Sequence, residues 1–166
     1  MRRTSGLIFI SFGQNNVNAS QIGSMIKPIL VVGEQSLSIE DVVAVARQEC
    51  QVALSETPSW RELIQRGADF LDQLLLDEGV IYGVTTGYGD SCLVEIPMHQ
   101  VHELPLHLSR FHGCGLGENL DLITARAVVI TRLCSLARGY SGVSLSLLER
   151  LVWMLNENVI PVIPSE

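Results

Sequence analysis

The sequence predicts a mainly α-helical chain with very little sheet. Apolar residues recur at the three-to-four-residue spacing of a helix face in several long segments. Helix-start signals stand in front of two of these segments, at Ser38–Asp41 and at Ser59–Glu62. Because the connections are short, we expect helices packed on one another. A short β element is expected near the N-terminus, and another directly before Tyr82.

The first residues are expected to lie outside the folded part. Arg2 and Arg3 precede an apolar run that is shorter than the roughly 7–15 residues of a signal-peptide core, and no cleavage motif follows it. We therefore expect a poorly ordered leader or extension at 1–27 and a folded region at 28–166. The most apolar later stretch, 127–137, is interrupted by Arg132, so no membrane span is predicted.

The first half of the folded region predicts a strand followed by two helices. Residues 27–38, KPILVVGEQSLS, suggest a strand, a turn at Gly33 and a second extended stretch. A helix is predicted from Ser38 to about Leu54, and Thr57–Pro58 ends it. The second helix begins at Ser59, and Gly79 suits the position after its end. The first helix has one apolar face, made of Val42, Val45, Ala46, Cys50 and Ala53.

The second half predicts a glycine-rich loop and three more helices. Residues 83–90 form a loop after the apolar, briefly extended Val80–Tyr82, and 104–114 form a helix with Pro105 in its first turn. A helix capped by Asn119 should run from 120 to about 138, and a last one should start after Ser144 or Ser146. The 120–138 helix is apolar nearly all round, so we expect deep burial for its faces, including Ile123, Ala127, Ile130, Cys134 and Ala137.

Charge and composition exclude some functions. The net charge is −7 and Lys27 is the single lysine, which argues against a nucleic-acid surface. The four cysteines show no paired spacing, as expected of reduced thiols in a cytoplasmic protein. His99 and His102 lack an acidic partner at a zinc-site spacing, so no metal is predicted.

The hexapeptide TTGYGD at 85–90 admits several interpretations. It differs by one residue from a potassium-channel filter, but no flanking segment is able to span a membrane. It lacks the lysine of a phosphate loop and the sheet that such a loop needs. Tyr82 is either a core residue or a general base beside a mobile loop, and a phenol acts as a base only after losing its proton. For His112, the residues alone favour a buried, hydrogen-bonded histidine near a helix end over a ligand-binding one.

The stretch from Tyr82 to Gly89, YGVTTGYG, resembles the YGVxTGFG-type loop of the histidine, phenylalanine and tyrosine ammonia-lyases and the related aminomutases. Other blocks resemble the same family in the same order: LSIEDVVAVAR (37–47), HLSRFHGCGLGENLD (107–121) and ARAVVITRLCSLARGYSGVSLSLLERLVWMLNENVIPVIP (125–164). Because ordered blocks at matching spacing are a stronger signal than one motif, the resemblance covers 28–166.

The resemblance implies the N-terminal part of the helical ammonia-lyase (fumarase/aspartase-like) fold. It implies a homotetramer that removes ammonia non-oxidatively from an amino acid to give an α,β-unsaturated acid. The family uses a methylidene-imidazolone group (MIO) made from an internal Ala-Ser-Gly. Tyr82 matches the catalytic base and Gly89 matches a loop glycine near substrate. Phe111 and His112 match the pair that faces the substrate side chain, and they leave histidine, phenylalanine and tyrosine all open.

Two departures from the family pattern stand out. Cys134 replaces a residue that is often Asn, which alters local hydrogen bonding. No Ala-Ser-Gly occurs among the 166 residues, so we expect the chain alone to be inactive. The alternative is a non-catalytic helical module or a split-lyase subunit that binds a partner chain. Lyase and aminomutase activity both remain open.

Overall fold

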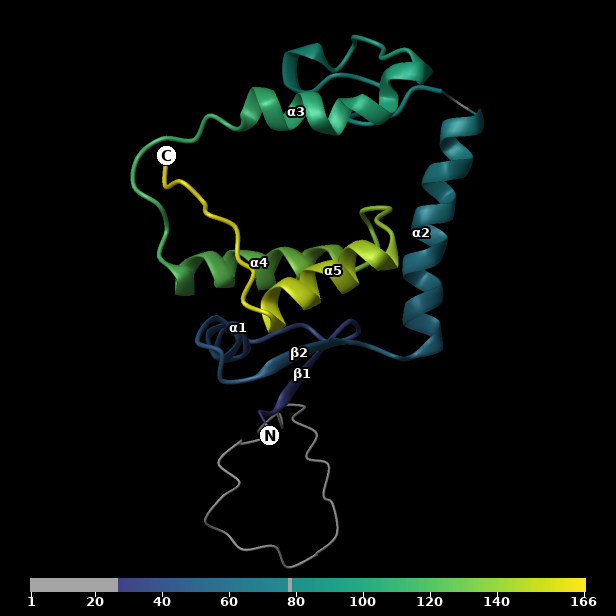
Figure 1. The fold of residues 1–166 in the computed structure, drawn as a ribbon. Coiled ribbons are helices and arrows are strands. Elements are labelled where there is room, and N and C mark those ends of the chain that lie inside the picture. Colours follow the sequence, from purple (N-terminus) through teal and green to yellow (C-terminus); the bar gives the residue numbers. More distant parts are fainter. Residues whose placement is uncertain (1–26, 78) are drawn as a thin grey trace, which may run out of the picture.

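The computed structural model describes residues 27–77 and 79–166, so the leader expected at 1–27 lies outside it apart from Lys27. The described chain is mainly helical with one small sheet, which confirms the predicted fold class (Figure 1). In chain order the elements are β1 (Ile29–Val32), α1 (Ile39–Ala46), β2 (Gln51–Leu54), α2 (Pro58–Asp77), the 3-10 helices η1 (Gly89–Ser91) and η2 (Met98–Glu103), α3 (Leu104–His112), α4 (Leu122–Leu136) and α5 (Leu145–Asn156).

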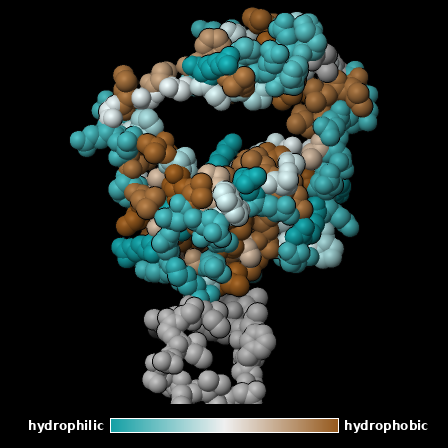
Figure 2. All heavy atoms as spheres, viewed as in Figure 1, coloured by the Kyte–Doolittle hydropathy of each residue, from teal (hydrophilic) through white to brown (hydrophobic). Residues whose placement is uncertain are grey.

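The elements are arranged in two parts, joined along one side by α2 (Figure 1). We call β1, α1, β2, α4 and α5 the lower body. Residues 79–117, which contain η1, η2 and α3, form the upper layer. Figure 2 shows an opening between the two parts. Within the described residues, no helix has both the length and the apolar character needed to cross a bilayer.

The second strand is where the sequence predicts helix. The helix expected from Ser38 to Leu54 ends at Ala46. Gln48 then takes a φ of +59°, a left-handed conformation that turns the chain into β2. The strands lie parallel, with Leu30 beside Val52. The second β element is therefore 51–54, and no strand occurs at 80–82.

The capping box predicted at the start of α1 is present. The Ser38 side chain accepts the Asp41 N–H at 3.1 Å, and the Asp41 carboxylate accepts the Ser38 N–H at 2.9 Å. Each end of the box satisfies a backbone donor that the helix itself leaves unpaired. The sequence therefore located the start of this helix correctly, although not its end.

A buried arginine joins the ends of two helices in the lower body. Arg126 on α4 is only 2% exposed. It donates to the Val45 and Ala46 carbonyls at the end of α1, with its shortest bond 2.8 Å, and to the Leu155 carbonyl of α5 at 2.9 Å. Such carbonyls lack partners within their own helix and carry partial negative charge. Burial lowers the pKa of Arg126, but a guanidinium stays protonated in proteins.

A side chain closes the edge of β2 that faces away from β1. Asn156 accepts the Val52 N–H at 2.9 Å and donates its amide to the Val52 carbonyl at 2.9 Å. The amide thus reproduces both bonds that a neighbouring strand would make. The last residue of α5 is thereby fixed to the sheet.

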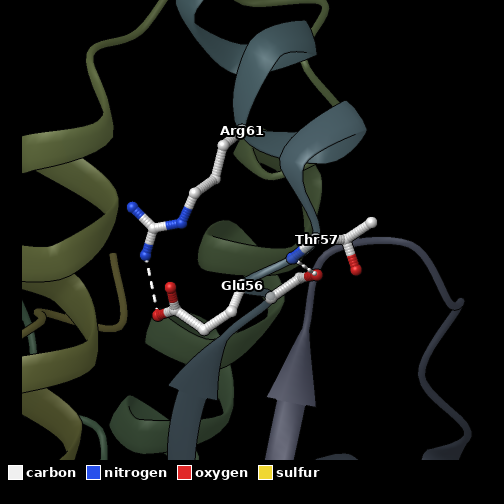
Figure 3. Close-up of polar contacts among 4 residues, drawn as sticks. Glu56, Thr57 and Arg61 are labelled. Atoms are coloured by element: carbon white, nitrogen blue, oxygen red, sulfur yellow. Dashed lines mark hydrogen bonds and ion pairs between the residues drawn. The ribbon is translucent and has the colours of Figure 1, made fainter.

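Helix α2 begins in the lower body and then leaves it. Its first residue is Pro58 and the Thr57 carbonyl accepts the Trp60 N–H, so the start predicted at Ser59 lies too late. Figure 3 shows how this start is held: the Ser55 hydroxyl accepts the Thr57 N–H at 3.1 Å, and Arg61 pairs with Glu56 at 2.7 Å.

Trp60 anchors the lower end of α2. Its indole N–H donates to the Ala137 carbonyl at 2.9 Å in a buried position. Ile64, one turn later, is the other buried residue of this helix. Beyond Ile64, α2 leads to the upper layer (Figure 1).

Helix α4 forms the centre of the lower body but is not buried all round. Its cap is Asp121, whose carboxylate accepts the Thr124 N–H at 2.9 Å, so the cap predicted at Asn119 is wrong. Leu122, Ile123 and Val128 remain about half exposed. Deep burial on every face is therefore not found within the described chain. The apolar residues that α4 does bury are Ala125, Val129, Ile130, Leu133 and Leu136.

Candidate active site

The TTGYGD loop is held by two threonines. Residues 86 and 95 form an antiparallel bridge, and Thr85 and Thr86 are almost fully buried at its base. The Thr85 hydroxyl accepts the Ile81 N–H at 2.6 Å, and the Thr86 hydroxyl accepts the Gly83 N–H at 3.2 Å. Because buried hydroxyls satisfy the turn's backbone, the loop has a defined shape despite its glycines.

Tyr82 and Gly89, two of the predicted site residues, lie together. The Tyr82 ring is 65% exposed, so it is not a core residue. Its hydroxyl oxygen accepts the Gly89 N–H at 3.4 Å. Gly89 has a φ of +56°, which suits glycine, and the space where a Cβ would stand is open.

A second tyrosine supports Tyr82. The ring of Tyr88 meets that of Tyr82 edge to face, with centroids 6.3 Å apart and planes at 78°. The Tyr88 hydroxyl donates to the Gly83 carbonyl at 3.0 Å, which fixes the ring at the loop's base. The Tyr82 phenol is therefore placed by its neighbours while its outer face stays open to solvent.

Phe111 and His112 lie at the C-terminal end of α3. Phe111 is 76% exposed, and the His112 Nδ1 is 3.3 Å from the Leu108 carbonyl of the same helix. His112 is thus hydrogen-bonded near a helix end, as one interpretation predicts, but it is exposed rather than buried. Both side chains are available to a ligand or a further protein surface.

The structure does not join this pair to the Tyr82 loop. Tyr82, Gly89, Phe111 and His112 all belong to the upper layer, where the loop and α3 are neighbours (Figure 1). No hydrogen bond or aromatic contact links Tyr82 to either α3 residue within 79–117.

Three titratable residues at the start of α3 form a small surface network. Glu103 lies 3.6 Å from His102 and 3.5 Å from His107. Across residues 27–77 and 79–166, no group of three or more His, Cys, Asp or Glu is arranged to hold a metal ion. The histidines are best described as exposed helix residues.

A separate cleft of about 620 Å³ lies in the lower body. It is bounded by the 32–37 segment, the start of α2 and the end of α4, and none of the predicted site residues lines it. Cys134 of α4 lies on its wall. Burial raises the pKa of the Cys134 thiol to about 11, so this thiol stays protonated and unreactive at neutral pH.

Sequence reasoning missed the residues that shape the loop. Thr85 and Thr86 are its buried supports, and Tyr88 packs against the ring of Tyr82. A threonine pair inside a glycine-rich stretch is a usable signal, because threonine hydroxyls readily bond nearby backbone. Nothing in the sequence marked Arg126, whose partners come from distant helices.

Comparison with known proteins gives a consistent result. The family model for aromatic amino acid lyases matches residues 37–166. A histidine ammonia-lyase of Caldanaerobacter subterraneus is 38% identical over 137 residues, which cover 82% of this chain and 27% of that protein. The chain therefore spans about a quarter of the length of this curated relative.

Solved structures share the fold over the same region. The tyrosine aminomutase of Streptomyces globisporus superposes with a TM-score of 0.75 at 33% identity, over 81% of this chain and 25% of that one. The histidine ammonia-lyase of Trypanosoma cruzi gives a TM-score of 0.71 at 27% identity, over 83% and 27%. Lyases and aminomutases are thus both represented among similar proteins.

Proposed function

The chain belongs to the aromatic amino acid lyase family, and on that premise we propose that it supplies the Tyr82 loop and the Phe111–His112 pair of an ammonia-lyase site. The reaction is the non-oxidative removal of ammonia from histidine, phenylalanine or tyrosine, giving the α,β-unsaturated acid. The observation that carries this proposal is the exposed Tyr82 hydroxyl, held beside the Gly89 N–H in a shaped loop.

Each residue has a distinct role in the proposal. The Tyr82 oxygen takes the proton from the substrate β-carbon, and the Gly89 N–H, 3.4 Å away, helps to hold that oxygen in position. Phe111 offers an apolar ring to the substrate side chain, and His112 offers a ring nitrogen. Selection among histidine, phenylalanine and tyrosine then depends on how Phe111 and His112 contact the substrate side chain.

The MIO group implied by the family does not fit the residues present. The 166 residues contain no Ala-Ser-Gly, so they do not supply the tripeptide from which the group forms. We derive no step through it. In the proposal, the group is contributed by another part of the protein or by another chain.

Assembly as a cytoplasmic homotetramer is part of the proposal. Large apolar side chains are exposed on α4 and in the upper layer, including Leu122, Ile123, Leu93 and Phe111. Exposed apolar surface of this extent is typical of surfaces that contact other protein segments. All four cysteines are free, which suits a reducing compartment.

A product screen tests the proposed function. We would express the protein from its complete reading frame, and the 166-residue chain separately, and supply histidine, phenylalanine and tyrosine. Absorbance distinguishes urocanate, cinnamate and coumarate. We expect one of these products from the complete protein and none from the 166-residue chain. A folded complete protein that forms none of the three contradicts the proposal, as does turnover by the chain alone.

A second candidate is a non-catalytic helical module, or a split-lyase subunit that binds a partner. The exposed apolar faces favour it. It predicts a stop codon after codon 166 and co-purification of the tagged chain with a protein that carries Ala-Ser-Gly. A continuous reading frame containing that tripeptide would exclude it.

A further inference from the structure

The segment that follows His112 is tied to the 163–166 segment by a short antiparallel ladder. Asn119 and Pro164 form its bridge. The ladder has four backbone hydrogen bonds: Leu120 N–H to Ile163 O (2.8 Å), Ser165 N–H to Glu118 O (2.8 Å), Leu116 N–H to Glu166 O (2.7 Å) and Glu166 N–H to Leu116 O (3.1 Å). We call residues 116–120 and 163–166 together the strap.

The strap contains one extra residue on its first strand. Glu118 pairs with Ser165, but the next pair is Leu116 with Glu166, so Gly117 has no opposite residue. Gly117 takes a φ of +81°, and this left-handed position is where a β-bulge requires glycine. The bulge lets the chain turn from the strap toward α3 without losing the last hydrogen-bonded pair.

Gly115 allows the two segments to approach closely. A Cβ at this position would lie 2.6 Å from Cγ and 2.8 Å from Cβ of Pro164. Such distances force a displacement of one segment, because the proline ring is rigid. The sequence Gly115-Leu116-Gly117 is therefore fitted to Pro164 and Glu166 at two separate points.

We propose that the strap is a positioning device for the substrate pair on α3, with Gly117 and Pro164 in the strap and the adjoining Gly115 as positioning residues. The upper layer is attached through α2 at one end and through the segment after α3 at the other (Figure 1). Three residues, 113–115, separate His112 from the strap. A shift of the strap is therefore passed to Phe111 and His112 over a very short length of chain.

The consequence for catalysis rests on the proposed function. Tyr82 lies on a different segment, whose shape depends on Thr85 and Thr86 rather than on the strap. Displacing α3 should accordingly weaken substrate binding more than it slows proton removal. In kinetic terms the Michaelis constant rises while kcat changes less.

The test uses a clash and its relief in the 166-residue chain. Gly115→Ala introduces the clash with Pro164, and Gly115→Ala/Pro164→Gly removes both ring atoms that cause it. Cys114→Ser is the matched control, because it changes the neighbouring exposed residue outside the strap and keeps a donor for the Phe111 carbonyl, to which the thiol donates at 3.5 Å. NMR would follow amide exchange at Leu116, Leu120, Ser165 and Glu166, together with the His112 ring resonances.

We expect Gly115→Ala to speed exchange of the strap amides about tenfold or more, as local opening becomes easier. The His112 resonances should shift or broaden in the same variant. Both effects should be largely reversed in the double variant and absent in Cys114→Ser. Wild-type strap amides without protection overturn the proposal, and so do loosened amides with unchanged His112 resonances. Neither amide exchange nor the His112 resonances require turnover. Failure of the positioning role is therefore distinguishable from failure of the proposed function.

The complete protein adds a kinetic test of the same proposal. Gly115→Ala should raise the Michaelis constant about tenfold with a smaller change in kcat, the pattern of lost substrate binding. The double variant should recover the wild-type constant. A loss confined to kcat contradicts the positioning role.

Discussion

The lower body and the upper layer use similar residues but bury them very differently. In the lower body, Val45, Ile130, Leu133 and Leu148 are completely buried, and Arg126 links two helix ends. Among the side chains described between 79 and 117, Thr85 and Thr86 are the only buried ones. The lower body therefore has a hydrophobic core. The upper layer has almost no buried side chains and is attached to the lower body at its two ends.

This contrast indicates that the residues that stabilise the fold and the residues of the proposed active site lie in different regions. Burial of apolar area is the main source of folding free energy, so the lower body should determine global stability. All four predicted site residues lie in the upper layer and make few contacts there. Substitutions in the lower body should consequently lower global stability, whereas those in the upper layer should act locally.

The largest effect is expected for Arg126→Ala. It removes donors from carbonyls at the ends of α1 and α5 and leaves those groups buried. The free energy of unfolding should fall by about 3 kcal/mol or more, measured by urea denaturation. Arg132→Ala, an exposed arginine on the same helix, should cost less than about 0.5 kcal/mol. Equal losses in the two variants would contradict the role of Arg126.

Asn156→Ala should have an intermediate effect within the same region. It removes both hydrogen bonds to Val52 and opens the edge of β2. We expect a loss of about 1–2 kcal/mol in unfolding free energy. Gln51→Ala, on the exposed face of the same strand, is the control and should be nearly neutral. If the two variants match, the side-chain closure of this edge contributes nothing.

Thr85→Val probes the upper layer, because valine has nearly the same shape as threonine but lacks its hydroxyl. The Ile81 N–H loses its acceptor, which should destabilise the loop locally by about 1 kcal/mol. Hydrogen-exchange mass spectrometry should show faster exchange at 81–96 and unchanged exchange in β2 and α4. Equally faster exchange in the lower body would mean that the two regions open together, and the separation would be wrong.

At neutral pH the smallest effect is that of Cys134, whose contribution becomes visible only as a pH dependence at alkaline pH. Burial raises the pKa of this thiol from 9.0 to about 11, so the unfolded thiol ionises at a lower pH than the folded one. Its contribution is therefore complete below pH 9 and is lost as the pH rises toward 11. The melting temperature of the wild type should fall more between pH 8 and 10.5 than that of Cys134→Ser. An identical fall in both proteins would refute the burial of this thiol.

Local signals in the sequence predicted part of the fold correctly. The Ser38–Asp41 capping box and Pro105 in the first turn of α3 are confirmed, since both depend on neighbouring residues alone. The predicted end of α1, near Leu54, is wrong because the apolar residues at 50–54 fit either a helix face or a strand. That end is stabilised by Arg126, which is 81 residues from Val45 in sequence, and no local pattern reports such a contact.

Only the part of the candidate site that lies within one loop was predictable from local sequence. Tyr82 and Gly89 share one loop, and the structure places them in contact. Phe111 and His112 came from the family resemblance, and their facing a substrate remains a proposal. The buried threonines and the strap depend on how the loop and the 163–166 segment fold back, which short-range patterns do not encode.

The most direct test of the account is Tyr82→Phe in the complete protein. Removing the hydroxyl takes away the proposed base but keeps the ring, which is largely exposed and packs edge to face on Tyr88. We predict that kcat falls about a hundredfold or more, while the melting temperature stays at the wild-type value. Retained turnover in this variant, with the same product formed at a similar rate, would contradict the assignment of Tyr82 as the base.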